Sequence, residues 1–134
     1  MTNRTIVLVT AVYVLLTAPA ASGHHAFATV FDAKKPIKMT GTVTKIEWQN
    51  PHIWFYIDVK DDDGKVTNWG MEMASPNLLM RAGWSRDSLK VGDVVSVEGF
   101  RAKDDSPTGN AQVVVLGSTG QRLFAGSTQV QPSR

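Results

Sequence analysis

Two of the three histidines in this 134-residue sequence, His24 and His25, are adjacent and follow an apolar N-terminal segment. That segment has the layout of a cleavable export signal, with a positive charge at Arg4, an apolar run over residues 6–17 and small residues up to Gly23. A cut within its last three residues would leave a histidine first or third in the mature chain. There the new amine and an imidazole can chelate copper(II) or nickel(II). A cut one residue earlier would not allow this.

The third histidine, His52, follows a proline and opens a predicted strand, so it is the candidate for a rigid third ligand. The sequence therefore predicts a copper(II) site built from His24, His25 and His52. If His24 becomes the first residue, its amine and imidazole form a histidine brace, and a copper-dependent redox enzyme is an alternative. The other interpretation is an incidental histidine pair in a solvated segment, since short histidine tracts are only compositional indications of metal binding.

The run PHIWFYIDVK alternates aliphatic residues with aromatic or polar ones, which predicts a strand buried on one face. The opposite face carries His52, Trp54 and Tyr56. Together with Trp48, the two aromatic residues form a candidate ligand-binding face for a protein, a peptide or a saccharide, because small β-barrels bind such ligands on this region. The alternative is that the phenylalanines of the preceding segment, residues 24–35, cover these aromatic rings and close a second small core.

No arrangement of residues typical of an enzyme occurs in the sequence. It contains no cysteine, which excludes disulfides, thiolate metal sites and cysteine nucleophiles. It also lacks a serine nucleophile elbow, a phosphate-binding glycine loop and a dinucleotide motif. The aspartate runs at residues 61–63 and 104–105 lie in predicted polar turns, where aspartate is common. We therefore predict a non-enzymatic binding protein.

The charge of the sequence is nearly balanced, with 14 basic and 12 acidic residues, and Arg4 belongs to the predicted signal. Because the basic residues are scattered, the basic patch expected of a nucleic-acid-binding surface is missing. The sequence predicts an unknown protein or small ligand as the partner, and no nucleic acid. The apolar run is short for a membrane span, which needs about 20 residues, so we expect no stable span after cleavage. An uncleaved N-terminal anchor is the alternative.

The rest of the sequence predicts one domain of five strands and a short helix. The strands are expected over residues 36–50, 51–60, 66–74, 94–102 and 111–117, and the helix over 75–83. The apolar phase of the first strand slips at Lys45, which indicates a bulge or bend. A bent first strand, and a helix between the third and fourth strands, are typical of the OB-fold, a five-stranded barrel. Another small barrel or sandwich is the alternative.

The predicted organisation is a signal peptide at 1–23, an extended lead-in at 24–35, an OB-like β-barrel domain at 36–126 and a flexible tail at 127–134. The barrel core is predicted to contain Val43, Ile53, Phe55, Ile57, Val95 and Val97. A second apolar group is predicted to pack as core around the helix; it comprises Trp69, Met71, Met73, Leu78, Leu79, Met80 and Trp84.

The helix itself has recognisable ends. Ser75 is a suitable N-cap, and Pro76 suits the first turn. Gly83 suits the C-terminal end, where a left-handed backbone conformation is common.

Several segments also resemble DUF6152, a family of short exported bacterial proteins of unknown function. They are HHAFA, TGTVTKIEWQNPHIWFYIDVKD, GW…DSLKVGD and RLFAG, and the resemblance covers nearly the whole mature chain. It implies an exported, OB-like barrel and supplies no activity, cofactor or catalytic residue. The sequence as a whole therefore predicts a small periplasmic or secreted binding domain that binds copper or another divalent metal. The alternative is an interaction module that uses the aromatic face.

Overall fold

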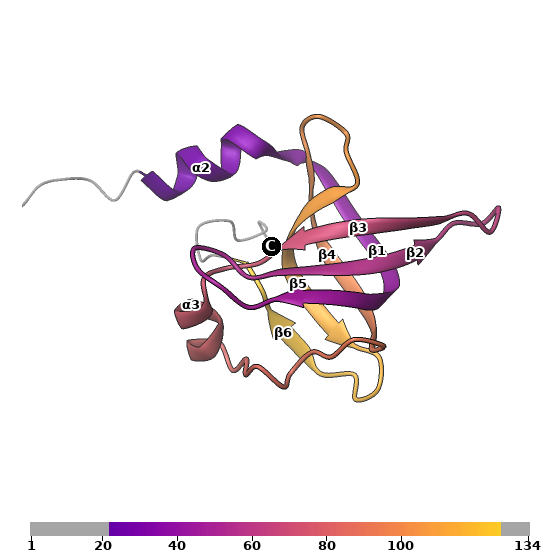
Figure 1. Ribbon diagram of the computed structural model, residues 1–134. Coiled ribbons are helices and arrows are strands. Elements are labelled where there is room, and N and C mark those ends of the chain that lie inside the picture. The colour runs from indigo at the N-terminus through magenta and orange to yellow at the C-terminus, as the bar shows by residue number, and fades with distance from the viewer. Residues whose placement is uncertain (1–21, 127–134) are drawn as a thin grey trace, which may run out of the picture.

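The computed structural model describes residues 22–126, with side chains from Ala26 onward. It is built mostly from strands, with two short helices (Figure 1). In chain order the elements are α2 (Ser22–Val30), β1 (Phe31–Glu47), β2 (Trp54–Lys60), β3 (Val66–Glu72), α3 (Pro76–Arg81), β4 (Val94–Ala102), β5 (Thr108–Leu116) and β6 (Arg122–Phe124).

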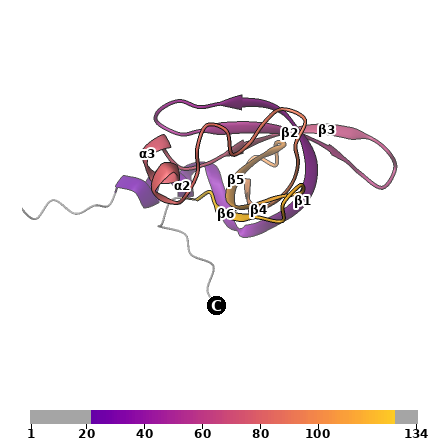
Figure 2. The same cartoon turned by 90° about the horizontal axis from the view of Figure 1, so that it is seen from below.

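The strands form a closed barrel. They lie in the order β3-β2-β1-β4-β5-β6, and an additional parallel pairing between β3 and β5 closes a ring of five strands (Figure 2). The short β6 pairs with β5 outside this ring. A ring in which β1 pairs with both β2 and β4, with a helix between β3 and β4, is the topology of the OB-fold. The predicted fold class is confirmed.

Strand β1 serves two sides of the barrel because it is long and irregular. Its first part pairs with β4 and its last part with β2. The register with β2 shifts between Val43 and Lys45, where the sequence predicts a bulge. At Gly41 the strands approach so closely that a Cβ would lie 2.7 Å from the Asp58 carbonyl oxygen. A side chain at this position would push the two strands apart.

The core fills the inside of the barrel and contains the residues at the start of and within β2 that the sequence assigns to it. Ile53, Phe55 and Ile57 have no exposed surface. Val43, Val95 and Val97 are also buried, so the predicted core is confirmed.

Helix α3 closes one end of the barrel and is shorter than the predicted range. Ser75 is the N-cap and accepts a hydrogen bond from the Leu78 amide, and Gly83 follows the helix with a φ of 96°. Leu79 and Trp84 are buried, as predicted. Leu78 and Met80, in contrast, are 39% and 53% exposed, so their assignment to the core was wrong. A helix of two turns can direct only one stripe of side chains inward.

The predicted extended lead-in over residues 24–35 was wrong in its first part, because Ser22–Val30 forms helix α2. Among the described side chains of α2, Phe27 is partly buried and the others are exposed. Its ring packs against Phe31 and Phe100 at centroid distances of 5.6 and 5.9 Å. The helix therefore contacts β1 and β4, and Phe27 does not cover the aromatic residues of β2 in the predicted way.

Candidate binding face on strands β2 and β3

Trp54 and Tyr56 lie on the outside of the barrel, because the buried residues of β2 alternate with them. Both aromatic residues are partly exposed. In the strand register Trp54 lies between Glu47 on β1 and Glu72 on β3, while Tyr56 lies opposite Gly70. We call this surface, made of Trp54, Tyr56, Gly70, Glu72 and the adjoining Glu47, the β2–β3 face.

Gly70 gives the two aromatic rings room to lean across β3. A Cβ at this position would lie 3.2 Å from Cε1 of Tyr56 and 3.6 Å from Cζ3 of Trp54. The first distance is too short for comfortable packing, so a side chain here would displace the Tyr56 ring. The glycine therefore leaves the space over β3 that the Tyr56 ring occupies.

Glu72 is the centre of a polar network that borders Trp54. Its Oε1 lies 3.2 Å from Nδ1 of His52 and 3.4 Å from Nδ2 of Asn110. Asn110 accepts a hydrogen bond from Gln112, and both amides are 7% exposed. Burial raises the pKa of Glu72, although the neighbouring His52 acts in the opposite direction.

The contact with Glu72 gives His52 a defined orientation. Nδ1 faces the Glu72 carboxylate, while the His52 side chain as a whole is 42% exposed. The imidazole is therefore accessible to a ligand beside Trp54.

Glu47 is held on the other side of Trp54. It forms an ion pair with Lys45, and Oε2 accepts a hydrogen bond of 3.1 Å from the Tyr56 hydroxyl. These hydrogen bonds lower the pKa of Glu47, which stays a carboxylate. Burial raises the pKa of Tyr56, whose hydroxyl remains a donor. The Lys45 amine also lies 5.2 Å from the centre of the Tyr56 ring.

The structure brings together only some of the residues predicted as sites. His52 lies just before β2 rather than inside it, and it joins Trp54 and Tyr56 on the β2–β3 face. Trp48 packs against the core cluster, and the Arg86 guanidinium lies 5.7 Å from its ring centre, so it belongs to a different surface. His24 lies in helix α2, but its side chain is outside the described part of the chain, as is that of His25.

The network partners Glu72, Asn110 and Gln112 were missed by sequence reasoning. Glu72 and Asn110 face each other through the parallel β3–β5 pairing, a contact between strands that are far apart in the chain. The one available signal was that two amides interrupt an otherwise apolar strand at residues 108–116. Buried amides need hydrogen-bond partners, so this pattern predicts a polar neighbour without naming it.

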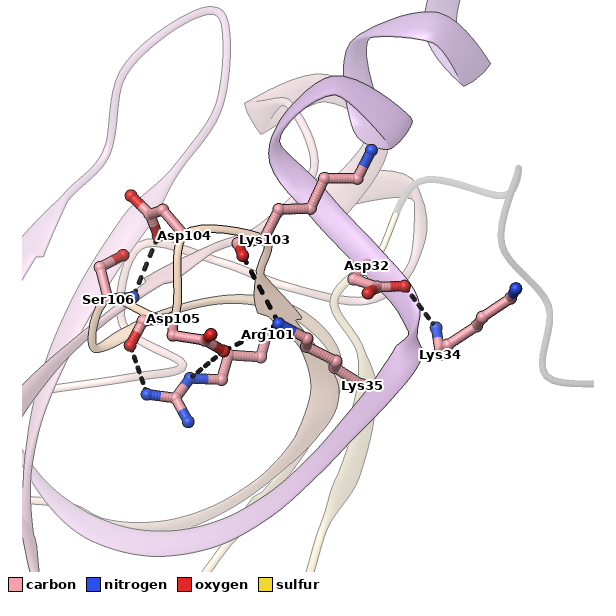
Figure 3. A network of polar contacts seen from close by, with 8 residues as sticks. All are labelled: Asp32, Lys34, Lys35, Arg101, Lys103, Asp104, Asp105 and Ser106. Atoms are coloured by element: carbon pink, nitrogen blue, oxygen red, sulfur yellow. Dashed lines mark hydrogen bonds and ion pairs between the residues drawn. The ribbon is translucent and has the colours of Figure 1, made fainter.

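A second polar network holds the loop between β4 and β5, residues 103–107 (Figure 3). Lys35 on β1 binds Asp105 at 2.8 Å, and Arg101 donates to the Asp105 carbonyl oxygen. Asp105 itself has a φ of 61°, and the ion pair with Lys35 lowers the pKa of its carboxyl. Lys103 donates through Nζ to the Ala28 carbonyl oxygen of α2. We call this network the loop clamp.

Within the described residues, no group of three or more histidines, cysteines or acidic residues is arranged to hold a metal ion. No helix among them is long and apolar enough to cross a membrane. The predicted ligand set includes two side chains outside the described part, so the copper prediction stays a prediction.

The fold and the β2–β3 face together define an OB-type barrel with a partly exposed aromatic surface bordered by a histidine–carboxylate pair. The family model described as a family of unknown function, DUF6152, matches residues 11–112. The chain therefore belongs to the DUF6152 family, which confirms the resemblance seen in its sequence. No curated protein matches it.

Among solved structures, a similar chain is the mitochondrial single-stranded DNA-binding protein Rim1 of S. cerevisiae. The two share 12% sequence identity with a TM-score of 0.49, over 62% of this chain and 93% of the other. The sequence-based exclusion of nucleic acid as a partner was wrong, because a protein with a similar chain path is described as binding single-stranded DNA.

Proposed function

We propose that this protein is an exported, non-enzymatic binding domain that takes a hydroxyl-rich ligand, a saccharide, on its β2–β3 face. The observation that carries the proposal is the environment of Trp54. Its partly exposed indole lies between Glu47 and Glu72 in the strand register. The His52 imidazole, 3.2 Å from Glu72, adds a further polar group there.

The polar groups around Trp54 are mainly acceptors. The Glu47 and Glu72 carboxylates only accept hydrogen bonds, and the partly exposed His52 imidazole lies beside Glu72. A ligand that fits such a border supplies several donors, as sugar hydroxyls do. An indole surface, in turn, suits the apolar side of a sugar ring. The border also carries little excess charge because Glu47 is paired with Lys45.

The test is a titration of the mature protein with a panel of cello-, chito- and malto-oligosaccharides, followed by tryptophan fluorescence and calorimetry. We expect binding by one of these, and a loss of at least about tenfold in affinity for Trp54→Ala, as for a stacking residue. Phe124→Ala is the matched control, since Phe124 is an exposed aromatic residue on β6.

An oligothymidylate and an unrelated peptide are titrated in parallel. If either one binds and its affinity depends on Trp54 in the same way, the β2–β3 face is the binding site but its ligand is not a saccharide. Unchanged affinity of Trp54→Ala for every ligand that binds would reject the face itself.

Export is part of the proposal, and its support is the layout of residues 1–23 in the sequence. Intact-mass measurement of the protein from the periplasm tests it. The expected result is a chain that begins between Ala21 and His24. A full-length chain retained in the membrane would contradict it.

Copper(II) binding is a second candidate function, favoured by the orientation of His52. A histidine that binds metal usually has a carboxylate beside its other ring nitrogen, and the Glu72 carboxylate lies 3.2 Å from Nδ1 of His52. We propose that His24 and His25, with the new amino terminus, supply the other ligands.

The test compares copper(II) affinity of the mature protein, of a form with one extra N-terminal alanine, and of His52→Ala. Both changes should weaken binding. Affinity should also fall on acidification, because protons compete with the metal for its nitrogen ligands. Unchanged affinity in both altered forms would reject the site.

A further inference from the structure

Strand β3 has an open edge on the side away from β2. Within residues 22–126, β5 pairs with β3 only at Gly70–Glu72, which leaves residues 66–69 unpaired on that side. The β2–β3 hairpin projects beyond the barrel there, as both views show (Figures 1 and 2). This part of the molecule is therefore a strand edge accessible to another chain.

The hydrogen bonds at the two ends of the hairpin show which residues bond across to β2. The Asp61 amide donates to the Lys65 carbonyl oxygen at 2.9 Å, and the Met73 amide donates to the Ile53 carbonyl oxygen at 2.8 Å. In an antiparallel pair, hydrogen-bonded and non-hydrogen-bonded residues alternate. With this register, the odd-numbered residues of β3 bond to β2.

The even-numbered residues point the other way. Gly70 demonstrates this, because its amide donates to the Pro107 carbonyl oxygen at 3.0 Å, on the β5 side. The same alternation directs the N–H and C=O groups of Val66 and Asn68 out of the open edge. They offer two donors and two acceptors in the spacing of a β-ladder.

We propose that this edge binds an extended, basic segment of another protein as an added β-strand. Alternating donors and acceptors along an edge are matched by the backbone of an extended peptide, which is the basis of strand addition. Strand β5 already uses the same edge in a parallel orientation at Gly70–Glu72. An added strand would continue the sheet in line with it.

The charge of the hairpin favours a basic segment over a second copy of this chain. Residues 58–68 contain four aspartates and two lysines, a net charge of −2. Asp62 and Asp63 are exposed at its tip. Pairing two copies along this edge would bring two acidic hairpins together, whereas a strand with lysines at its ends would be attracted. Val66, 55% exposed, adds an apolar contact.

The test titrates the protein with the peptide acetyl-Lys-Val-Thr-Val-Lys-amide and follows backbone amide resonances by NMR. The largest shifts are expected at Val66 and Asn68. The same peptide with its three central amides methylated should bind at least about tenfold more weakly, since it cannot form the ladder. Amide exchange should be fast at Val66 and Asn68 in the free protein and slower with peptide. Thr67, which bonds to β2, should be protected in both states.

Val66→Pro removes one edge donor without removing a bond to β2, and proline is tolerated on strand edges. It should weaken peptide binding at least about tenfold, while Val66→Thr keeps the donor and the affinity. The proposal is overturned if both variants bind alike, if methylated peptide binds equally well, or if no shift appears at millimolar peptide. Protection of Val66 and Asn68 in the free protein would also overturn it, because another segment or a second copy would already occupy the edge.

Discussion

The β2–β3 face and the loop clamp are both polar regions on the outside of one barrel, yet they use their polar groups differently. In the loop clamp, Lys35 and Arg101 bind Asp105, and Lys103 binds the end of α2. On the β2–β3 face, both contacts of Glu72 with His52 and Asn110 are made by Oε1, and His52 contacts Glu72 through Nδ1. The polar groups of the loop clamp bind one another and stabilise the loop. Those of the β2–β3 face keep atoms that can bind a ligand.

The loop between β4 and β5 is one of the regions through which OB-folds bind ligands. Here, Asp104 and Asp105 accept hydrogen bonds from the loop or its neighbours, and Arg101 also lies 5.3 Å from the Trp69 ring centre. The loop is therefore built to position α2 and β1. The proposed ligand-binding surface lies instead on strands β2 and β3, where Trp54 and Tyr56 are partly exposed.

The largest expected effect comes from the core beneath the β2–β3 face. Phe55 is completely buried under Trp54 and Tyr56, and Phe55→Ala should lower the free energy of unfolding by roughly 3–5 kcal/mol. Chemical denaturation measures this change. Phe124→Ala, on an exposed phenylalanine, should stay within about 0.5 kcal/mol. A loss below about 1 kcal/mol for Phe55→Ala would mean that β2 does not support the face.

Independence of the two regions is the next expectation. Lys35→Met removes an ion pair of the loop clamp, so it should leave saccharide affinity within about twofold, because Arg101 still binds Asp105 and Gly70 still bonds to Pro107. Trp54→Ala should lower that affinity at least about tenfold while amide exchange in residues 103–107 stays unchanged. Calorimetry and hydrogen exchange measure the two outcomes. A Lys35→Met variant that loses binding would show that the loop clamp belongs to the binding site.

A smaller effect is expected where the loop clamp meets α2. Lys103→Met removes the cation at the C-terminal end of the helix, an interaction worth about 0.3–1 kcal/mol. Hydrogen exchange should become faster in residues 26–30 and stay unchanged in the barrel strands. Lys34→Met, on an exposed neighbouring lysine, is the control. Equal exchange in both variants would mean that the Lys103 amine does not hold the helix, which then depends on contacts such as the Phe27 packing and the bond from the Lys103 amide to the Val30 carbonyl oxygen.

The smallest expected effect is the pH dependence of the β2–β3 face. Burial raises the pKa of Glu72 above its unfolded value near 4.5, so the folded state binds a proton more readily than the unfolded state. The charged carboxyl costs stability above the folded pKa, and that cost disappears as the pH falls toward the unfolded pKa.

Glu72→Gln should therefore remove this gain of stability on acidification, and it keeps an acceptor for His52. Thermal unfolding of both proteins between about pH 4 and 7 measures the difference in slope. Identical slopes would show that Glu72 is too well solvated to couple folding to pH.

The sequence by itself determined the barrel. Alternation in β2 selects Phe55 and its neighbours for the core, and the phase slip at Lys45 marks the bulge, because both follow from the period-2 geometry of a strand. Ser75 and Gly83 likewise predict the ends of α3, because helix capping depends on residues within a few positions of each end. These features depend on residues a few positions apart.

Only the tertiary structure decided α2 and the partners of Glu72. Helix α2 has no regular apolar stripe, and its C-terminal end is held by Lys103, which is 75 residues from Ala28 in the chain. Glu72 reaches Asn110 only because β3 and β5 pair to close the barrel. A helix of nine residues is marginal on its own in water. A contact between distant strands has no local pattern that encodes it, so both features arise from the closed fold.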